Sequence, residues 1–271
     1  MRHGKRVYDR SRYQLDFRNP QVRAHATEVI DRVVNEYGVG YIKMDYNIEP
    51  GIGTELDADS YGDGLLGHNR AYLEWLDGIF EKYPDLIIEN CSSGGLRMDY
   101  AMLSRYSIQS TSDQEDYVRY ATITANAPSA VTPEQAAVWS YPLTNGDCEE
   151  VIFNMVNALL LRIHQSGHLV NLSPERFGYV KEAISYYKTI RHLTKKALPY
   201  WPLGLSSYND PWVSLGLEAE GKDFLAVWRR DSQSPVQEIP VKHLKGKEVE
   251  AVCAITKAQS ADFTGIKRQA R

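Results

Sequence analysis

Tyr41-Ile-Lys-Met-Asp-Tyr-Asn47 and Ser110-Thr-Ser-Asp-Gln-Glu-Asp116 are two acidic stretches, and each follows a short apolar run that is typical of a buried strand. A third stretch, Glu89-Asn-Cys-Ser-Ser-Gly-Gly95, lies between them and also follows an apolar run. Polar side chains directly after buried strands are typical of the functional edge of a parallel α/β sheet. The three stretches therefore predict both the fold and the place of the functional groups.

Strand and helix patterns alternate along most of the chain. Apolar spacing predicts strands at residues 13–17, 39–44, 86–88, 107–109, 128–132 and 167–172. It predicts helices that start after Asn19, near Tyr72 and after Ser173, a long apolar helix over 149–165, and a Gly/Asp-rich loop over 48–67. Six strand–helix units of this kind predict a parallel sheet covered by helices, which is an α/β fold.

The pattern changes after residue 202. Short apolar runs at 213–217, 224–228, 236–241 and 249–255 alternate with turn residues, which is typical of antiparallel strands. We therefore expect an α/β domain over residues 1–202 and a small antiparallel, β-sandwich-like domain over 203–271. The chain has 271 residues, of which 43% are hydrophobic, and this is enough for a large core and a small one.

Composition and charge argue against several classes of protein. The net charge of −4 and the lack of a dense Lys/Arg block argue against a nucleic-acid partner. No apolar run approaches the roughly 18 residues that a membrane-spanning helix needs. No apolar run follows the basic residues at 1–6 either, so we expect a cytoplasmic protein without a secretion signal. Cys91, Cys148 and Cys253 are widely spaced, which favours neither disulfides nor a metal site, and we expect no cofactor.

Asp45 is the first candidate for catalysis. It follows a predicted buried strand, and Lys43 and Asn47 lie two residues on either side, so the three side chains point the same way in an extended chain. An ionised carboxylate beside a cation is a good nucleophile or charge stabiliser. A purely structural Lys43–Asp45 ion pair explains the spacing equally well.

Asp113 is the second candidate. It lies close to Glu115 and Asp116, and a carboxyl group among carboxylates tends to keep its proton, as a general acid must. The alternative is a solvated acidic turn or a helix cap, because Ser112 or Asp113 precedes a helical pattern.

The loop at residues 90–95 combines small polar groups with two glycines, which allow a ligand to come close to the backbone. Cys91 is an alternative nucleophile, but no histidine is tied to it by a local signature. Arg97 and Asp99 follow, and we expect them to orient this loop or to contact a ligand.

These three stretches resemble glycoside hydrolase family 36, the bacterial-type α-galactosidases. The resemblance covers roughly residues 10–200 and includes the segments at 14–17 and 166–169 and the helix after Ser173. It implies a (β/α)8 TIM-type barrel followed by a C-terminal β-domain. It also implies a retaining hydrolase that removes terminal α-linked galactose from raffinose- or melibiose-like oligosaccharides through a covalent galactosyl–enzyme intermediate.

The family motifs imply roles for residues of this chain. The Lys-x-Asp-x-Asn motif matches Lys43, Asp45 and Asn47, which implies that Asp45 is the nucleophile and that its two neighbours bind sugar hydroxyls. The Ser-Asp-x-x-Asp motif implies that Asp113 is the acid/base residue, and the carboxyl groups of retaining pairs lie about 5–5.5 Å apart. The Cys-Ser-x-Gly-Gly motif adds residues that line the galactose pocket: Cys91, Ser93, Gly94 and Gly95.

The chain departs from the family pattern in two respects. Family members commonly carry a tryptophan three residues before the acid/base residue, where this chain has Ser110. This change leaves α-N-acetylgalactosaminidase or α-galactosyl transferase activity of the same clan as alternatives. The chain also begins near the family's third barrel strand, and six units of eight cannot close the barrel. We therefore expect a fragment, a truncated gene product or a subunit that needs a partner, and we also expect a homo-oligomer. An inactive sugar-binding or assembly fragment is the alternative from another class.

Overall fold

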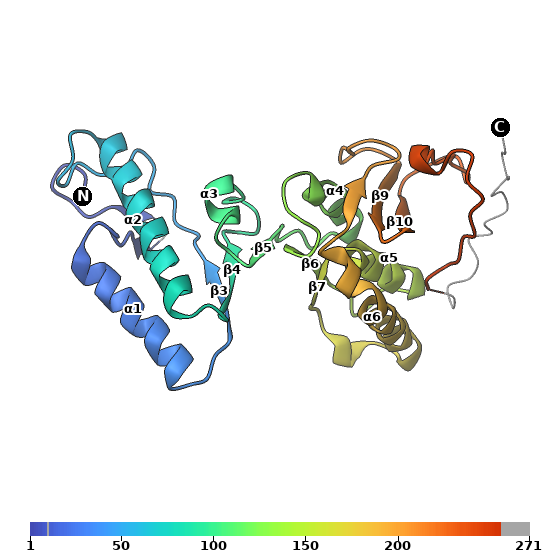
Figure 1. Ribbon diagram of the computed structural model, residues 1–271, viewed down its shortest axis with the longest axis horizontal. Coiled ribbons are helices and arrows are strands. Elements are labelled where there is room, and N and C mark those ends of the chain that lie inside the picture. The colour runs from blue at the N-terminus through green and yellow to red at the C-terminus, as the bar shows by residue number, and fades with distance from the viewer. Residues whose placement is uncertain (10, 256–271) are drawn as a thin grey trace. The chain divides into compact units, whose positions relative to one another are not determined.

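The computed structural model describes residues 1–9 and 11–255, which form two compact units (Figure 1). Unit 1 is Met1–Gln109, and unit 2 begins at Ser110. Each unit has a hydrophobic core of its own.

Unit 1 is an α/β structure. Its elements are β1 (Tyr8–Asp9), β2 (Arg12–Tyr13), α1 (Pro20–Asn35), β3 (Tyr41–Asp45), α2 (Tyr61–Lys82), β4 (Ile87–Cys91), α3 (Tyr100–Leu103) and β5 (Ile108–Ser110), whose last residue opens unit 2. β3, β4 and β5 are parallel neighbours in chain order, and β1 and β2 form a short antiparallel pair. Figure 1 shows α1 and α2 on the same side of β3 and β4.

The core of unit 1 lies between its helices and its sheet. It consists of buried residues from α1, α2, α3, β4 and the adjoining turns: Ile30, Tyr72, Trp75, Leu76, Ile79, Leu86, Ile88, Met102 and Tyr106. Ile42 and Met44 of β3 pack against this core. Tyr41, Lys43 and Asp45 alternate with these two residues, so they lie on the opposite face of the strand. Core packing therefore decides which face of β3 carries the functional groups.

Helix α2 begins inside the segment for which we predicted a loop. The Ser60 hydroxyl accepts the N–H of Asp63 at 3.1 Å, and this cap starts the helix at Tyr61. Gly64 is required by packing, because a Cβ there would lie 2.2 Å from the carbonyl oxygen of Thr54. The predicted loop over 48–67 is therefore wrong from residue 61 onward, since capping and close packing outweigh the low helix propensity of glycine.

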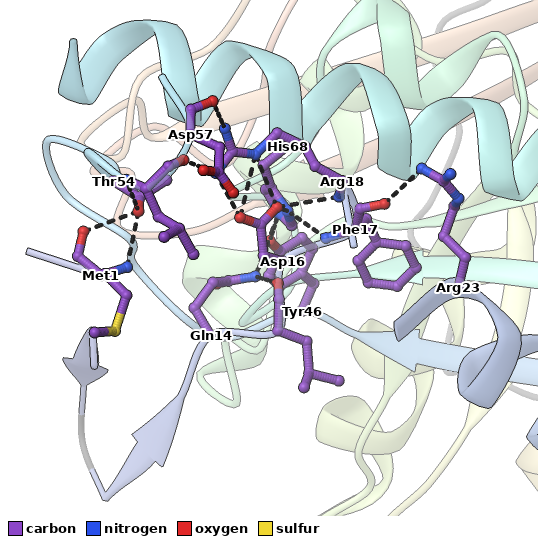
Figure 2. A network of polar contacts seen from close by, with 12 residues as sticks. Met1, Gln14, Asp16, Phe17, Arg18, Arg23, Tyr46, Thr54, Asp57 and His68 are labelled. Atoms are coloured by element: carbon purple, nitrogen blue, oxygen red, sulfur yellow. Dashed lines mark hydrogen bonds and ion pairs between the residues drawn. The ribbon is translucent and has the colours of Figure 1, made fainter. Parts of the chain in front are cut away.

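The strand predicted over residues 13–17 is mostly wrong. β2 ends at Tyr13 and pairs only with β1 among the described strands. Beyond it, the N–H of Phe17 donates to His68 Nδ1 at 3.2 Å, and Gln14 Nε2 donates to the Tyr46 hydroxyl at 2.8 Å (Figure 2). The polar and apolar residues of this segment therefore alternate because they contact the side chains of Tyr46 and His68, and not because the segment pairs in a sheet.

Unit 2 continues the α/β pattern and ends in an antiparallel sheet. Its helices and strands are α4 (Tyr117–Asn126), β6 (Ala136–Ser140), α5 (Cys148–Leu159), β7 (Arg162–Gln165), α6 (Pro174–Thr194), β8 (Leu198–Tyr200), β9 (Trp212–Ala219) and β10 (Lys222–Arg229), with 3-10 turns at Ala127–Ser129, Leu169–Asn171 and Lys242–Leu244. β6 and β7 are parallel, and β9 lies between β8 and β10 in the antiparallel sheet. Figure 1 shows α5 and α6 side by side, and both contribute to the core of this unit. The predicted combination of a parallel sheet with helices and a small antiparallel sheet is confirmed.

Three predictions between residues 127 and 172 are wrong. The strand predicted at 128–132 overlaps a 3-10 turn that begins at Ala127, and the strand of this region is β6. The helix predicted over 149–165 ends at Leu159, and residues 162–165 form β7 instead. Residues 167–172 form no strand and include the turn Leu169–Asn171. Only Leu160 and Leu161 separate α5 from β7, and no Gly or Pro marks the end of the helix, which explains the second error.

The last two predicted strands are not found in the described part of the chain. Residues 236–241 and 249–255 form no ladder there, and Val236 and Val252 are 72% and 79% exposed. Pro235 precedes the first run and Pro240 lies within it, and proline cannot donate a ladder hydrogen bond. The domain boundary at residue 202 stays a prediction, and residues 256–271 of the second predicted domain lie outside the described residues.

Gly216 is a glycine in the middle strand of the antiparallel sheet. It lies opposite Tyr200 in the register of β8 and β9, and a Cβ at Gly216 would lie 2.1 Å from Cζ of the Tyr200 ring. His243 packs edge-on against the same ring at a centroid distance of 4.7 Å. The ring therefore occupies the space of the missing side chain.

We expect Gly216→Ala to lower the free energy of unfolding by about 1–3 kcal/mol, because the Tyr200 ring must leave its place. Gly178→Ala in α6 is the matched control, since a Cβ there meets nothing within 4 Å. Removing this helical glycine should stabilise the protein by roughly 0.5–1 kcal/mol. Urea unfolding followed by circular dichroism measures both changes, and equal effects would contradict the close packing.

Candidate active site

The parallel register of β3 and β4 arranges the polar groups of unit 1. Lys43 lies opposite Glu89, and Asp45 lies opposite Cys91. The carboxyl ends of parallel strands meet at one edge of a sheet, and in barrel enzymes this edge carries the active site. The register therefore brings together two of the three stretches that the sequence singled out.

Glu89 is a buried carboxylate that our sequence reasoning missed. It is 1% exposed, Lys43 Nζ lies 3.6 Å from its Oε1, and the Tyr41 hydroxyl donates to its Oε2. Lys43 therefore has an ionic partner across the strands. The sequence contained a signal for this pair. Glu89 lies two residues before Cys91, just as Lys43 lies two residues before Asp45, so parallel pairing of the two strands places Glu89 opposite Lys43.

Asn47 connects Asp45 to the glycine loop after β4. Its Nδ2 donates to Asp45 Oδ2 at 2.6 Å, and its Oδ1 accepts the backbone N–H of Ser93 at 2.6 Å. Asp45 and Ser93 are exposed, and Asn47 is half-buried. The Asp45 carboxylate is therefore oriented by a hydrogen bond and accessible to a ligand.

The loop after β4 is tightly folded. Ser93 and Gly94 have φ values of 42° and 80°, and the N–H of Ser92 donates to the carbonyl of Gly94 at 3.1 Å. This left-handed backbone is favourable for glycine and strained for Ser93. Cys91 is only 1% exposed, which is unfavourable for a nucleophile that must reach a substrate.

Arg97 and Asp99 bind backbone groups near the loop, and the role that we expected for them in orienting the loop or contacting a ligand stays a prediction. Arg97 donates from Nε to the Tyr46 carbonyl at 3.1 Å and from Nη2 to the Ile48 carbonyl at 2.8 Å. Asp99 caps α3 by accepting the N–H of Ala101 at 2.9 Å.

A shallow pocket of about 400 Å³ opens beside Asp45 and Asn47. Its other lining residues come mainly from the segment before α1 and from the end of β3: Arg12, Tyr13, Gln14, Leu15, Phe17, Met44, Tyr46, Ile48 and Tyr72. The volume lies within the range of small-molecule sites, and the lining combines aromatic rings with a few polar groups. None of Lys43, Cys91, Ser93, Gly94 and Gly95 lines this pocket.

Asp113 is an exposed residue of unit 2, shortly after β5. Helix α4 is capped by Asp116, whose carboxylate accepts the N–H of Val118 at 2.9 Å. The helix cap that we considered at Ser112 or Asp113 is therefore wrong, because the helix begins one turn later. Asp45 belongs to unit 1, and the separation expected between the two carboxyl groups stays a prediction.

The acidic segment is anchored to β6. The N–H of Thr111 donates to the carbonyl of Ala137 at 3.2 Å, and the Tyr120 hydroxyl donates to the carbonyl of Ser112 at 3.3 Å. The same hydroxyl accepts the N–H of Trp139 at 3.3 Å. Burial raises the pKa of Tyr120 to about 12, so the phenol keeps its proton at neutral pH.

The described residues contain no group of three or more His, Cys, Asp or Glu side chains arranged to hold a metal ion. In the same part of the chain, no helix has both the length and the apolar character that crossing a bilayer requires. Cys91, Cys148 and Cys253 are free thiols.

Comparison with known proteins gives consistent matches. The family model described as Melibiase matches residues 1–196. The alpha-galactosidase Mel36A of Lactobacillus acidophilus is 25% identical over 211 residues, which cover 75% of this chain and 29% of that protein. The bifunctional alpha-galactosidase/sucrose kinase AgaSK of Mediterraneibacter gnavus is 27% identical over 239 residues, which cover 84% and 23%. The chain therefore spans less than a third of the length of these relatives.

Solved structures share the fold. A variant of the GH36 alpha-galactosidase AgaA of Geobacillus stearothermophilus, in complex with raffinose, matches with a TM-score of 0.76 at 18% identity, over 89% of this chain and 34% of that one. AgaB of the same organism matches with a TM-score of 0.76 at 19% identity and the same coverage. At such identities the likeness establishes the fold alone.

We expect Lys43→Met to lower the free energy of unfolding by about 1–3 kcal/mol, because the buried Glu89 loses its cation. Adding Glu89→Gln should recover part of the loss, since an amide carries no charge. Lys82→Met, which breaks the exposed pair with Asp31 on the outer helices, is the control and should have a smaller effect. Urea unfolding measures all three, and an equal loss in the control would contradict the role of Glu89.

Proposed function

Because the chain belongs to the Melibiase family, we propose that it carries the catalytic region of a retaining α-galactosidase. In this proposal it removes terminal α-linked galactose from raffinose- or melibiose-like oligosaccharides. The main support is the end of β3, where Asn47 orients the exposed Asp45 carboxylate through a hydrogen bond. The α-galactosidase names of the matched relatives agree with it.

The proposed reaction has two steps. Asp45 attacks the anomeric carbon of galactose while Asp113 gives its proton to the leaving glycosidic oxygen, which breaks the bond between the sugars. Asp113 then takes a proton from water, and the water oxygen attacks the anomeric carbon. This second step breaks the bond to Asp45, releases galactose and returns both carboxyl groups to their starting states.

The residues around Asp45 are proposed to bind the sugar. Lys43 and Asn47 carry ammonium and amide N–H groups that can donate to sugar hydroxyls. The loop after β4 is proposed to line the galactose pocket with these residues: Cys91, Ser93, Gly94 and Gly95. Glycine at positive φ lets the backbone come close to the sugar.

We also propose that the parallel strands are successive strands of a (β/α)8 barrel. The order of β3, β4 and β5 in unit 1 and the pairing of β6 with β7 in unit 2 support this fold. In a barrel, the face of β3 that carries Lys43 and Asp45 would be the inner one, because the core residues face the helices. A cytoplasmic location and a homo-oligomeric state stay predictions from the sequence.

Asp45→Asn is expected to reduce kcat on an aryl α-galactoside by at least about a thousandfold, because an amide cannot form the covalent intermediate. Asp31→Asn on the outer helix α1 is the control and should retain activity. A protein that shows no hydrolysis, or hydrolysis that Asp45→Asn leaves unchanged, would contradict the proposal.

Asp113→Asn is expected to reduce kcat on raffinose by about 10²–10⁴-fold, since the leaving sugar needs a proton. The loss should be smaller with a nitrophenyl α-galactoside, whose leaving group departs without protonation. Asp116→Asn is the matched control, because asparagine also caps a helix well. Equal losses for Asp113→Asn on both substrates would argue against the acid/base role.

The choice between galactose and N-acetylgalactosamine is tested with two nitrophenyl glycosides. Ser110, where family members commonly carry tryptophan, is fully buried at the end of β5. We expect a higher kcat/KM for the α-galactoside. A higher kcat/KM for the N-acetyl-α-galactosaminide would contradict the proposed substrate and indicate an α-N-acetylgalactosaminidase. Transfer of galactose from raffinose to a second sugar would indicate a transferase.

A further inference from the structure

Tyr46 lies between Asp45 and Asn47 in the chain, but its side chain makes contacts away from these two groups. Its hydroxyl lies 2.8 Å from His68 Nε2 of α2 and accepts a hydrogen bond from Gln14 Nε2 at 2.8 Å (Figure 2). Burial raises the pKa of Tyr46, so the phenol stays neutral. The residue is therefore fixed at its outer end by two segments that are distant in sequence.

The other end of Tyr46 is fixed as well. The Arg97 guanidinium lies 3.8 Å from the centre of its ring, and Arg97 Nε donates to its carbonyl. The Ser92 hydroxyl donates to the same carbonyl at 2.6 Å, and the N–H of Tyr46 donates to the carbonyl of Cys91 at 2.8 Å. Its ring, hydroxyl, carbonyl and N–H all have partners.

We infer that Tyr46 is the positioning residue for Asp45 and Asn47, and that buried His68 holds it in place. Fixing the central residue of three limits the movement of both flanking side chains. Asn47 in turn holds the N–H of Ser93 and the Asp45 carboxylate through its two hydrogen bonds. The effect on catalysis rests on the proposed function, but the effect on the Ser93 hydrogen bond does not.

The hydrogen bonds of His68 identify its tautomer. Its Nδ1 accepts the N–H of Phe17 at 3.2 Å, so in the neutral ring Nε2 carries the proton and donates to the Tyr46 hydroxyl. His68 is 3% exposed, and this burial lowers its pKa. Three charged groups face it: Asp16, with Oδ1 3.8 Å from Nδ1, raises its pKa, while Arg18 and Arg97 lower it.

The contacts of His68 with Tyr46 and Phe17 therefore depend on pH. Protonation of His68 places a proton on Nδ1, which then cannot accept the N–H of Phe17. The pKa of His68 in the folded protein lies below the ordinary histidine value of about 6.5. Neutral His68 therefore stabilises its contacts with Tyr46 and Phe17 fully above a pH of about 6.5. This stabilisation is lost as the pH falls through the lowered pKa of His68. Asp16 stays ionised in this window, because the hydrogen bonds and charge of Arg18 outweigh burial and lower its pKa.

Amide hydrogen exchange of Ser93, measured by NMR on the full chain at pH 7.5, tests the positioning role. Tyr46→Phe keeps the ring under Arg97 but removes the hydroxyl, and we expect protection of the Ser93 amide to fall by about fivefold or more. Tyr106→Phe is the matched control, because it removes another buried hydroxyl of the same core, bonded to Tyr72. Unchanged protection in Tyr46→Phe, or an equal loss in Tyr106→Phe, would overturn the inference.

The role of His68 is tested by repeating the measurement from pH 7.5 to pH 5, with rates corrected for intrinsic exchange. The wild-type protein should keep Ser93 protection at neutral pH and lose it as the pH falls through the lowered pKa of His68. His68→Gln should keep it, because the glutamine amide can donate to the Tyr46 hydroxyl and does not titrate. The same pH profile in both proteins would overturn the assignment to His68.

Kinetics separate this inference from the proposed function. If the wild-type protein hydrolyses an aryl α-galactoside, Tyr46→Phe should lower kcat by about tenfold or more with little change in KM, because a nucleophile displaced by a fraction of an ångström reacts more slowly. Tyr106→Phe should retain kcat, and an unchanged kcat in Tyr46→Phe would overturn the catalytic part. If the wild-type protein shows no turnover, the proposed function fails, and the exchange measurements still decide the positioning role.

Discussion

The parallel pairing of β3 with β4 is the constraint on which the site of unit 1 depends. Five residue pairs are aligned, from Tyr41 with Ile87 to Asp45 with Cys91. A slip of one residue would turn Asp45 toward the helices and expose Ile42, which packs against the core. The hydrophobic core and the functional face therefore specify the same register.

The two faces of β3 are stabilised by different forces. The helix side gains from burial of apolar surface, which is worth roughly 25 cal/mol per Å². On the other face, polar groups compensate one another, since Glu89 has Lys43 and Tyr41 as partners and Asp45 has Asn47. Desolvation of Glu89 is costly unless these partners stay in place, so the electrostatics of this face resist rearrangement.

The sequence predicted those parts of the structure that local pattern determines. The strands near Met44 and Ile88 and the helices after Asn19 and Ser173 were found because each has a clear apolar period or a cap. β7 was missed because only Leu160 and Leu161 separate it from α5, and no turn residue marks the end of the helix. The contacts of Tyr46 with Gln14 and His68 span 32 and 22 residues, and no local pattern encodes such pairs. Asp45 and the stretch from Glu89 to Gly95 could be singled out because each stretch of polar residues follows an apolar run.

The two hydrogen bonds of Asn47 have a consequence for chemical ageing. An amide can donate to the Asp45 carboxylate and also accept the N–H of Ser93, whereas a carboxylate can only accept. Spontaneous deamidation of Asn47 would place a second negative charge beside Asp45 without any mutation. The deamidated side chain would no longer donate to Asp45, and a mass increase of about one dalton would mark the altered molecules.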